Sequence, residues 1–347
     1  MSNPRGEADS AAPGLDFTVL LRRMAVLFVL ALAPAIAAAQ AVAPPQPIFT
    51  EDFSGDPAAA FPPPDKWTVS SLLDRKVRAL RVGLVADPIG KTVGRITVEQ
   101  GDALDGASDE ARLAKHYVCD TGGSRAAEFE ADPRGAPSER AEIQVKADRA
   151  SGTGELVKFG ETLWYRFSFK VSGEWPRDVP MSGREPCRTV VHQIKQNASK
   201  DGKDCGASPF FKIEARPLGE RVRFFAQLAA GDSCASPPAM KRTKICVDDL
   251  PRETWTTVSV RILPAQDASG RVDLWLNGAH CGSYAGPMGD PEHGARRNGV
   301  PFVDTQPRFG IYRDWRAETQ TIYFDKILFW NAEPTGHPDW SADPTPQ

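Results

Sequence analysis

The segment VVHQIKQN, residues 190–197, places a histidine, two glutamines and a lysine on an expected β-strand. His192 has a near-neutral ordinary pKa that suits proton transfer, and Lys195 could act as a base if burial lowered its pKa. Alternation along a strand sends Val191, Gln193 and Lys195 to one face and His192 to the other, among apolar neighbours. We therefore expect Gln193 and Lys195 to face an open site and His192 to be half buried. A bulge would be needed to rotate His192 into the same site.

A second segment, RFGIYRD at 308–314, alternates in the same way. Its phenylalanine and isoleucine are expected to point into a core, while Arg308, Gly310 and Tyr312 share the opposite face. Because glycine has no side chain, it leaves space for a ligand to approach Tyr312. The segment therefore predicts a ligand-facing side that carries Arg308 and Tyr312.

These segments must be positioned by a sheet, because period-two alternation recurs along the chain. Further strands are expected at 139–146, 163–171, 210–216, 221–228, 255–263, 271–278 and 321–330. Turn signals such as Asn277-Gly278 and Ser269-Gly270 lie between them. Helical periodicity is nearly absent, with one short helix expected at 109–117. Many antiparallel strands with closely spaced turns predict an all-β sandwich or jelly roll.

Several of these strands would present Arg, Gln, Lys and aromatic side chains towards one side of a sheet. These polar faces carry Arg140, Glu142, Gln144, Lys212, Glu214, Arg216, Arg221, Arg223, Phe225 and Gln227. A sheet that only faces water tends to mix Lys, Glu, Thr and Ser, whereas this pattern is typical of a concave sheet that holds a sugar polymer. Such a face can be locally basic although the chain has a net charge of -3.

The chain has 347 residues, with 42 Lys and Arg against 45 Asp and Glu. This balance gives no whole-protein argument for binding nucleic acid. The N-terminus has the pattern of an export signal, in which Arg22 and Arg23 precede an apolar run at 24–39 and small residues follow. The run is too short for a membrane anchor and is interrupted by Pro34. We expect residues 1–43 to be a leader and secretory signal peptide, and 44–347 to form a single secreted or periplasmic domain.

Six cysteines in an exported chain favour disulfide bonds, and the absence of a C-x-x-C pair argues against a zinc site. The pairing is not determined by the sequence. We expect short polar loops to be closed, which pairs Cys187 with Cys205 and Cys234 with Cys246 and leaves Cys119 with Cys281.

The segments SERAEIQV, HQIKQ and RFGIYRD, in this order and followed by IYFDKILFW, resemble the jelly-roll polysaccharide lyases. That group includes heparin lyase I, glucuronan lyase and the jelly-roll alginate lyases. The resemblance spans 49–330 and includes the opening FTEDFSGD. It implies a concanavalin A-like β-jelly roll, with two packed antiparallel sheets and a concave sheet that forms the substrate cleft. It also implies cleavage of a uronic-acid-containing anionic glycan by β-elimination.

In this family a base removes the proton at C5 of a uronate, the carboxylate is neutralised, and an acid protonates the leaving 4-oxygen. Neutralisation is needed because a second negative charge develops beside the carboxylate. Arg140 and Gln193 match the family's carboxylate ligands, and Tyr312 matches its acid, which is often also its base. The family has a histidine where this chain has Lys195. The base is therefore open between Tyr312, Lys195 and His192, and we favour Tyr312 with Lys195 as electrostatic helper or base.

Other polar side chains are expected to bind the substrate. They are Arg308, which falls where the family motif has a lysine, and Lys212, Arg216, Arg223, Glu142, Gln144, Trp315 and His116. Trp315 would stack on a sugar, and His116 would line one end of the cleft. Structural roles compete with these functions, since Arg140 could form a plain cross-strand ion pair with Glu142 or Glu214 and Tyr312 could be an ordinary sheet tyrosine.

Two other functions fit parts of the pattern. A glycoside hydrolase on the same fold would need two carboxylates about 5 to 9.5 Å apart, and EFEAD at 128–132 is the nearest approach to the usual motif. A lectin-like binding module would use the same polar face without turnover. No cofactor is expected to be required; some relatives bind calcium, but no ligand cluster in the sequence supports a calcium site. The expected partner is an anionic polysaccharide, with no nucleic acid and, after signal cleavage, no membrane, and we expect a monomer.

Overall fold

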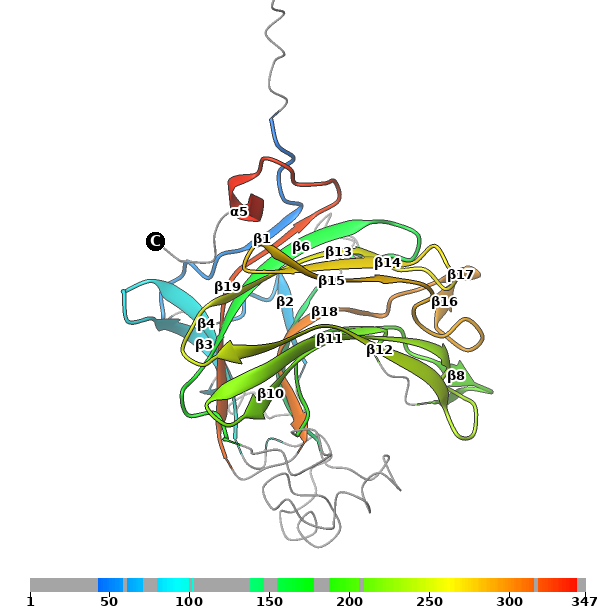
Figure 1. Cartoon of the computed structure of the whole chain (residues 1–347), viewed down its shortest axis with the longest axis horizontal. Helices are drawn as coiled ribbons and strands as arrows, with labels where there is room; N and C mark the ends of the chain where they lie inside the picture. Colours follow the sequence, from blue (N-terminus) through cyan, green and yellow to red (C-terminus); the bar gives the residue numbers. More distant parts are fainter. Residues whose placement is uncertain are drawn as a thin grey trace, which may run out of the picture. The chain divides into compact units, whose positions relative to one another are not determined.

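Two antiparallel sheets packed face to face contain most of the regular structure (Figure 1). The computed structural model describes residues 43–58, 61–70, 80–99, 102, 138–146, 155–177, 187–205, 209–314 and 318–341. Contacts divide the chain after Ala43, and every element below belongs to the unit that starts at Pro44. The predicted export signal and the predicted helix at 109–117 lie outside the described residues.

The first sheet has eight strands in the order β15-β14-β13-β6-β19-β4-β3, with β1 paired to β19. Its strands are β1 (Phe49–Glu51), β3 (Val82–Ala86), β4 (Thr92–Val98), β6 (Leu163–Val171), β13 (Thr256–Leu263), β14 (Arg271–Leu276), β15 (Ala279–Ala285) and β19 (Gln320–Trp330). A short helix, α5 (Pro338–Ser341), follows β19. Within the described part of the chain, no helix has the length and apolar character to span a membrane.

The second sheet has seven strands in the order β12-β11-β10-β7-β18-β5-β2. Its strands are β2 (Trp67–Ser70), β5 (Ser138–Val145), β7 (Thr189–Lys195), β10 (Phe211–Leu218), β11 (Arg221–Asp232), β12 (Ala239–Pro251) and β18 (Thr305–Asp314). Two small hairpins pair β8 (Ser199–Lys200) with β9 (Lys203–Asp204) and β16 (Arg296–Arg297) with β17 (Val300–Pro301). The predicted all-β jelly roll with two antiparallel sheets is confirmed.

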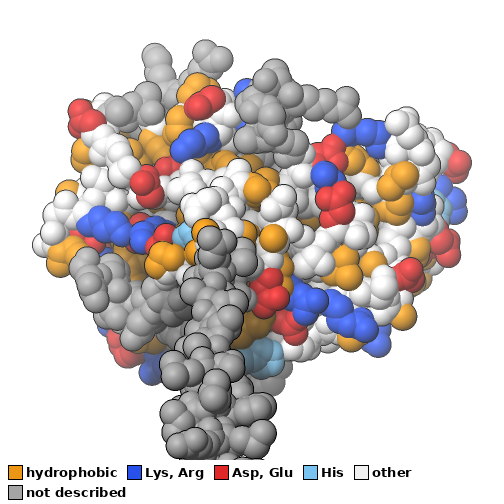
Figure 2. All heavy atoms as spheres, turned by 90° about the horizontal axis from the view of Figure 1, so that it is seen from above, with side chains coloured by type: hydrophobic (Ala, Val, Ile, Leu, Met, Phe, Trp, Pro, Cys, Tyr) orange, Lys and Arg blue, Asp and Glu red, His pale blue; other side chains and the backbone are white. Residues whose placement is uncertain are grey.

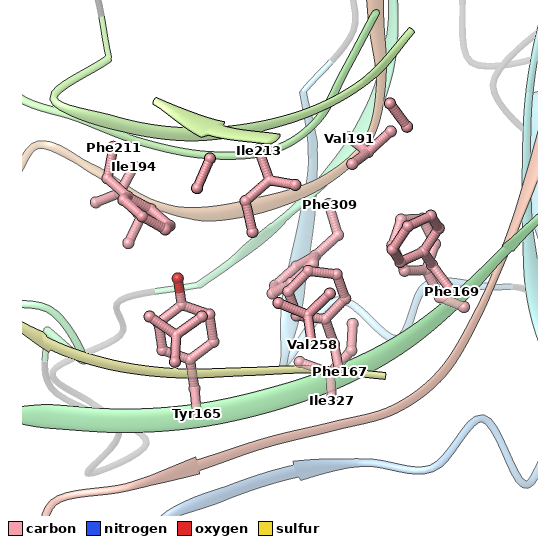
Figure 3. Close-up of a cluster of buried hydrophobic side chains, with 14 of the residues drawn as sticks. Tyr165, Phe167, Phe169, Val191, Ile194, Phe211, Ile213, Val258, Phe309 and Ile327 are labelled. Carbon is pink, nitrogen blue, oxygen red and sulfur yellow. The ribbon is translucent and has the colours of Figure 1, made fainter. Parts of the chain in front are cut away.

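Alternation explains why the sheets pack against each other. Tyr165, Phe167 and Phe169 on β6 point across the interface towards the second sheet, as Figure 3 shows. Phe309 on β18 makes ring contacts with Phe167 and with further aromatic residues, namely Trp67, His192, Phe324 and Phe329. Burying a side chain of this size contributes roughly 1.5–3 kcal/mol, so this aromatic layer holds the backbone of β18 in place.

The outer surface on the side of the eight-stranded sheet has a mixed charge. Figure 2 views the molecule from above the view of Figure 1, and its coloured Lys and Arg side chains lie intermixed with Asp and Glu. This pattern is typical of a solvated surface.

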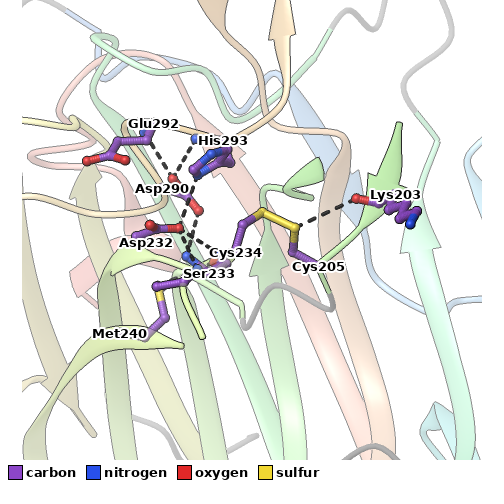
Figure 4. The surroundings of a disulfide bond; sticks show 10 residues. Lys203, Cys205, Asp232, Ser233, Cys234, Met240, Asp290, Glu292 and His293 are labelled. Carbon is purple, nitrogen blue, oxygen red and sulfur yellow. Dashed lines mark hydrogen bonds and ion pairs between the residues drawn. A yellow bond between two sulfur atoms is a disulfide. The ribbon is translucent and has the colours of Figure 1, made fainter. Parts of the chain in front are cut away.

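The disulfide pairing differs from the predicted one. Cys205 is bonded to Cys234 (Figure 4) and Cys246 to Cys281, while Cys187 is bonded to a partner outside the described residues. The predicted pairs Cys187 with Cys205, Cys234 with Cys246 and Cys119 with Cys281 are therefore wrong. The physical reason is that Cys246 lies on β12 and Cys281 on β15, the edge strands of the two sheets. Sheet packing brings them together, which loop length along the chain does not reveal.

Candidate active site

Polar side chains cover the face of the seven-stranded sheet that is turned away from the core. We call this surface the polar face, and its residues are Arg140, Glu142 and Gln144 on β5, Arg188 just before β7, Gln193 and Lys195 on β7, Lys212, Glu214 and Arg216 on β10, and Arg308 and Tyr312 on β18. Directly opposed residues of paired strands lie on the same face, so the register joins these strands into one surface. The structure thus brings together most of the residues that the sequence predicts for the site.

Tyr312 lies between two arginines on this face. It is opposite Arg140 in the register of β18 and β5, and the Arg140 guanidinium lies 5.4 Å from the centre of the Tyr312 ring. The guanidinium of Arg188 lies 4.7 Å from the same ring and is hydrogen-bonded to the Tyr312 side chain. Positive charge beside a phenol stabilises negative charge on its oxygen, which suits a group that releases and regains a proton.

Arg188 was not predicted as a site residue. Its guanidinium forms a 2.8 Å ion pair with Asp314 at the end of β18, and its backbone N–H donates to the same carboxylate. Burial acts to lower the pKa of Arg188, but Asp314 and Tyr312 outweigh it and the pKa is raised above its usual value. Arg188 therefore remains a fixed cation beside Tyr312.

A β-bulge in β7 explains why Arg188 was missed. In the register with β10, His192 is opposite Ile213 but Val190 is opposite Glu214, so β7 advances by two residues where β10 advances by one. The register with β18 is also irregular here, because β18 advances by three residues from Phe309 to Tyr312 while β7 advances by two. Val191 is the extra residue and belongs to the buried core cluster, so the prediction that it shares a face with Gln193 is wrong. The bulge moves the alternation by one residue, which places Arg188 on the same side as Gln193.

His192 lies in the core and not on the polar face. It is 0% exposed, and its ring contacts Tyr165, Phe167, Phe211 and Phe309. Its Nδ1–H donates to the carbonyl of Arg308 at 2.9 Å, so its Nε2 accepts from the Tyr165 hydroxyl at 2.9 Å. Burial lowers the pKa of His192 to about 3.

This environment corrects two expectations for His192. It is fully buried where the sequence suggested half burial, and no bulge rotates it into the site. The bulge lies at Val191, and His192 points inwards by ordinary alternation with Gln193. Both ring nitrogens already have partners, and the ring is neutral. His192 therefore supports the core beneath Arg308 on β18.

Lys195 lies at the end of β7 and is half buried. Burial lowers the pKa of its amine, partly opposed by the charges of Asp204 and Asp304. The positive charge of Arg308 also lowers this pKa, whereas Tyr312 raises it, which shows that both groups lie within electrostatic range of Lys195. The lysine can therefore act on Tyr312 as a nearby charge.

Glu142 connects several side chains of the polar face. Gln193 donates its amide to Glu142 at 2.6 Å, and the guanidinium groups of Arg140 and Arg308 lie 3.6 and 3.9 Å from the other carboxylate oxygen. Glu142 is 0% exposed, whereas the side chains of Arg140 and Arg308 are 20% and 17% exposed. Arg308 also donates to Gln144 at 2.8 Å. The carboxylate orients its neighbours, and the arginines reach the solvent.

Burial raises the pKa of Glu142, with Arg140, Arg308 and Gln193 opposing this effect. Glu214 behaves differently. Burial acts to raise its pKa, but ion pairs with Lys212 and Arg216, each at 2.5 Å, outweigh burial and lower the pKa. Neither carboxylate is exposed to a ligand.

Arg223 on β11 is opposite Arg216 in the register, so it lies on the same side of the sheet as the polar face, where it pairs with Asp249 on β12 at 2.9 Å. Trp315 and His116 lie outside the described residues. The predicted ion pair of Arg140 with Glu142 does form, but it leaves Arg140 beside Tyr312.

Gly310 allows β18 to approach β5 closely. Its φ angle is 148°, and a Cβ at this position would lie 2.3 Å from the carbonyl oxygen of Ala141. Only glycine fits such a position. Gly310 is opposite Glu142 in the register, so the close approach sets the spacing between Arg308 and Tyr312 on one strand and the Glu142 cluster on the other.

A pocket of about 680 Å³ adjoins the β2 and β5 end of the polar face. Its lining includes Thr68, Gln144, Lys158, Arg297 and Phe302. The Arg297 guanidinium lies 3.7 Å from the centre of the Phe302 ring. Glu155, which is paired with Arg297, and Asp304 also line the pocket, so it extends the polar face with charges of both signs and an aromatic ring.

Among the described residues, Asp232, Cys234, Asp290 and His293 lie close enough together to hold a metal ion (Figure 4). The Cys234 sulfur is used in a disulfide. Asp232 accepts from the backbone N–H of Cys234, and Asp290 accepts from those of Ser233 and His293. These hydrogen bonds connect two loops, which explains why the four side chains lie close together.

A model of the family described as Polysaccharide lyase matches residues 93–328. Among solved structures, the endo-β-1,4-glucuronan lyase from the fungus Trichoderma reesei is 14% identical, with a TM-score of 0.47 over 82% of this chain and 95% of that chain. Alginate lyase Aly36B is 12% identical, with a TM-score of 0.39 over 76% and 86%. An alginate lyase from Pseudomonas aeruginosa is 15% identical, with a TM-score of 0.34 over 55% and 74%. No curated protein matches the sequence.

Proposed function

Because the chain belongs to the polysaccharide lyase family, we propose that it cleaves a uronic-acid-containing anionic polysaccharide by β-elimination. The observation that carries this proposal is the position of Tyr312 between Arg140 and Arg188. The polar face as defined above contains six Lys or Arg residues and two Glu residues, which favours an anionic substrate.

The reaction requires a base, an acid and a means to neutralise the substrate carboxylate. The base removes the proton from C5, and the released electron pair forms a C4–C5 double bond as the bond from C4 to the leaving oxygen breaks. The leaving oxygen then takes a proton from the acid. No water is consumed, and the products are a new hydroxyl end and an unsaturated uronate.

We assign both proton transfers to Tyr312, whose phenol is half buried on the polar face and held by Arg188. Arg140 and Arg308, both partly exposed, would hold the substrate carboxylate, with Gln193 as a further donor. Glu142 would position these three groups without touching the substrate. The cations of the chain would neutralise the developing charge, so we propose no metal for this step.

Lys195 would supply further positive charge near Tyr312. Its lowered pKa also permits the alternative in which the neutral amine removes the C5 proton. The two roles differ in their response to substitution by arginine, as described in the Discussion.

A hydrolase mechanism finds less support. It would need two carboxyl groups open to the substrate, whereas Glu142 and Glu214 on the polar face are buried and paired with cations. A binding module would use the same surface but release no product. The test is the ultraviolet absorbance of the C4–C5 double bond after incubation with heparin, glucuronan, alginate and hyaluronan.

We also propose that the protein is exported. The support is its disulfide bonds, which form and persist in oxidising compartments, together with the sequence pattern at 1–43.

A further inference from the structure

One line of residues crosses all seven strands of the sheet that carries the polar face. Consecutive Cα partners run from Thr68 on β2 to Lys244 on β12, in the order Thr68, Gln144, Arg308, Gln193, Lys212, Gln227 and Lys244. We call this line the cross-strand row. Directly opposed residues share a face, so every member lies on the same side of the sheet as the site.

Glutamines and cations alternate strictly along this row. Gln144, Gln193 and Gln227 lie on β5, β7 and β11, while the cations lie on the strands between and beyond them, namely Arg308 on β18, Lys212 on β10 and Lys244 on β12. Neighbouring strands are about 4.8 Å apart, which is close to the length of one sugar in a 1,4-linked chain. Cations therefore recur at about 9.6 Å along the row, or every second strand.

We propose that the glycan lies along the cross-strand row with one sugar per strand, and that carboxylates face the row at every second sugar, opposite Arg308, Lys212 and Lys244. This inference deepens the proposed function and rests on it for the identity of the substrate as a uronate polymer. The intervening sugars face uncharged glutamines, of which Gln193 and Gln227 are buried and Gln193 already donates to Glu142. Thr68 joins the row to the pocket at the β2 end, which the same chain would enter.

The chemistry of this spacing defines a class of substrate. In an extended β-1,4-linked polyuronate, successive sugars are turned by half a turn, so every second carboxylate faces the same side. An alternating copolymer of a uronate and a neutral sugar has the same charge spacing for a different reason. The row accepts either source, and a test must compare them.

Lys244, at the β12 end of the cross-strand row, allows the effect of the spacing between cations to be separated from the effect of net charge. Lys244 is exposed and lies over the Phe225 ring at 4.6 Å, so its substitution leaves the core intact. Lys241 is a matched control, because it is an exposed cation on the same strand but three residues earlier, on the opposite face. The double substitution Lys244→Gln/Gln227→Lys moves the positive charge from β12 to the neighbouring strand β11 and leaves the net charge of the protein unchanged.

The experiment measures binding in the Tyr312→Phe protein, in which turnover is removed. The ligands are octasaccharides of β-1,4-linked glucuronate and of hyaluronan, titrated by calorimetry. We expect Lys244→Gln to weaken binding of at least one of them about fivefold, the range for an exposed charge contact. The combined Lys244→Gln/Gln227→Lys variant should stay as weak, and Lys241→Gln should have a smaller effect than Lys244→Gln. The octasaccharide whose binding is weakened by Lys244→Gln shows whether the substrate is a β-1,4-linked polyuronate or an alternating copolymer.

Three results would overturn the proposal: recovery of affinity in the combined variant, an equal loss in Lys241→Gln, or no binding of either octasaccharide. Failure of the proposed function is separate, because it is measured as absence of unsaturated product from the unmodified protein. If binding depends on the position of the Lys244 charge but the unmodified protein forms no product, the proposed path of the glycan along the cross-strand row is supported and β-elimination is rejected. If the unmodified protein forms product but binding does not depend on the position of the Lys244 charge, β-elimination is supported and the proposed path along the cross-strand row is rejected.

Discussion

The guanidinium of Arg188 lies 4.7 Å from the centre of the Tyr312 ring, and Asp314 holds it there through a 2.8 Å ion pair. Arg188 directly precedes β7, and Tyr312 lies on the neighbouring strand β18, whose register with β7 is shifted at this point. The arrangement gives the proposed proton-transfer group a fixed positive neighbour. Arg188 is a positioning residue in this account, since it acts through Tyr312.

Two substitutions of Arg188 should show whether its positive charge or the shape of its side chain matters for activity. We expect Arg188→Gln to lower kcat about 100-fold, in the range for loss of a charge that stabilises the reacting group, with a smaller change in KM. Arg188→Lys should recover part of the loss because it restores the charge. Steady-state kinetics on the best polyuronate checks this. An equal fall for both variants, with unchanged melting temperatures, would show that the positive charge is not the relevant property.

Lys195 offers a test between its two roles. If it acts as a cation, Lys195→Arg should keep most of kcat and Lys195→Met should lose about tenfold or more. Because burial lowers its pKa below the usual value, the activity of the unmodified protein should decline on the alkaline side as Lys195 loses its charge, and that decline should be absent in Lys195→Arg. If Lys195→Arg is as inactive as Lys195→Met, the amine is the base.

His192 predicts a dependence of stability on pH. Its pKa is about 3 in the folded protein against 6.5 for an ordinary histidine, so the unfolded chain binds more protons between these values. This contribution to the free energy of unfolding is present above pH 6.5 and is lost as the pH falls towards 3. His192→Gln lacks the titration, so its stability deficit relative to the unmodified protein should shrink by about 2–3 kcal/mol between about pH 7 and about pH 4. Urea unfolding at both pH values measures it, and an unchanged deficit would contradict the assignment.

The Cys246–Cys281 disulfide should stabilise the sandwich at one edge. It joins β12 and β15, which belong to different sheets, and its two cysteines are 35 positions apart in the sequence. The Cys246→Ser/Cys281→Ser variant should lose about 2–4 kcal/mol of unfolding free energy. Activity at a temperature where the variant is folded should be retained, because Cys246 and Cys281 lie outside the polar face. Loss of activity without loss of stability would connect this edge to the site.

The sequence was sufficient to predict the sheets because most strands have one apolar and one polar face. On β18 and β5 the alternation continues without interruption past Arg308, Tyr312 and Arg140, so their common face could be predicted. The same logic failed on β7, where Val191 is an extra residue. The segment contains no glycine or proline that would have signalled a bulge, and both Val191 and Arg188 were placed wrongly or missed for that reason.

Other features depend on contacts between distant segments. The disulfide pairs reflect which strands form the edges of the two sheets, and that order is a property of the assembled fold. The burial of Glu142 among Gln193, Arg140 and Arg308 requires three strands in register. The cross-strand row likewise appears only once the strand order is known, although each of its residues is visible in the sequence.

Tyr312 is proposed to transfer both protons in a β-elimination, and its substitution by phenylalanine tests this role most directly. The unmodified protein and Tyr312→Phe are incubated with glucuronan, alginate, heparin and hyaluronan, and the ultraviolet absorbance of the unsaturated uronate is followed, with oligosaccharide binding measured in parallel. We predict product from at least one polymer with the unmodified protein. Tyr312→Phe should lose at least about 1,000-fold in kcat, as expected for removal of a group that serves as both acid and base, and should keep its binding. Equal rates of product formation by the two proteins would contradict the role of Tyr312, and binding without any product from the unmodified protein would contradict β-elimination itself.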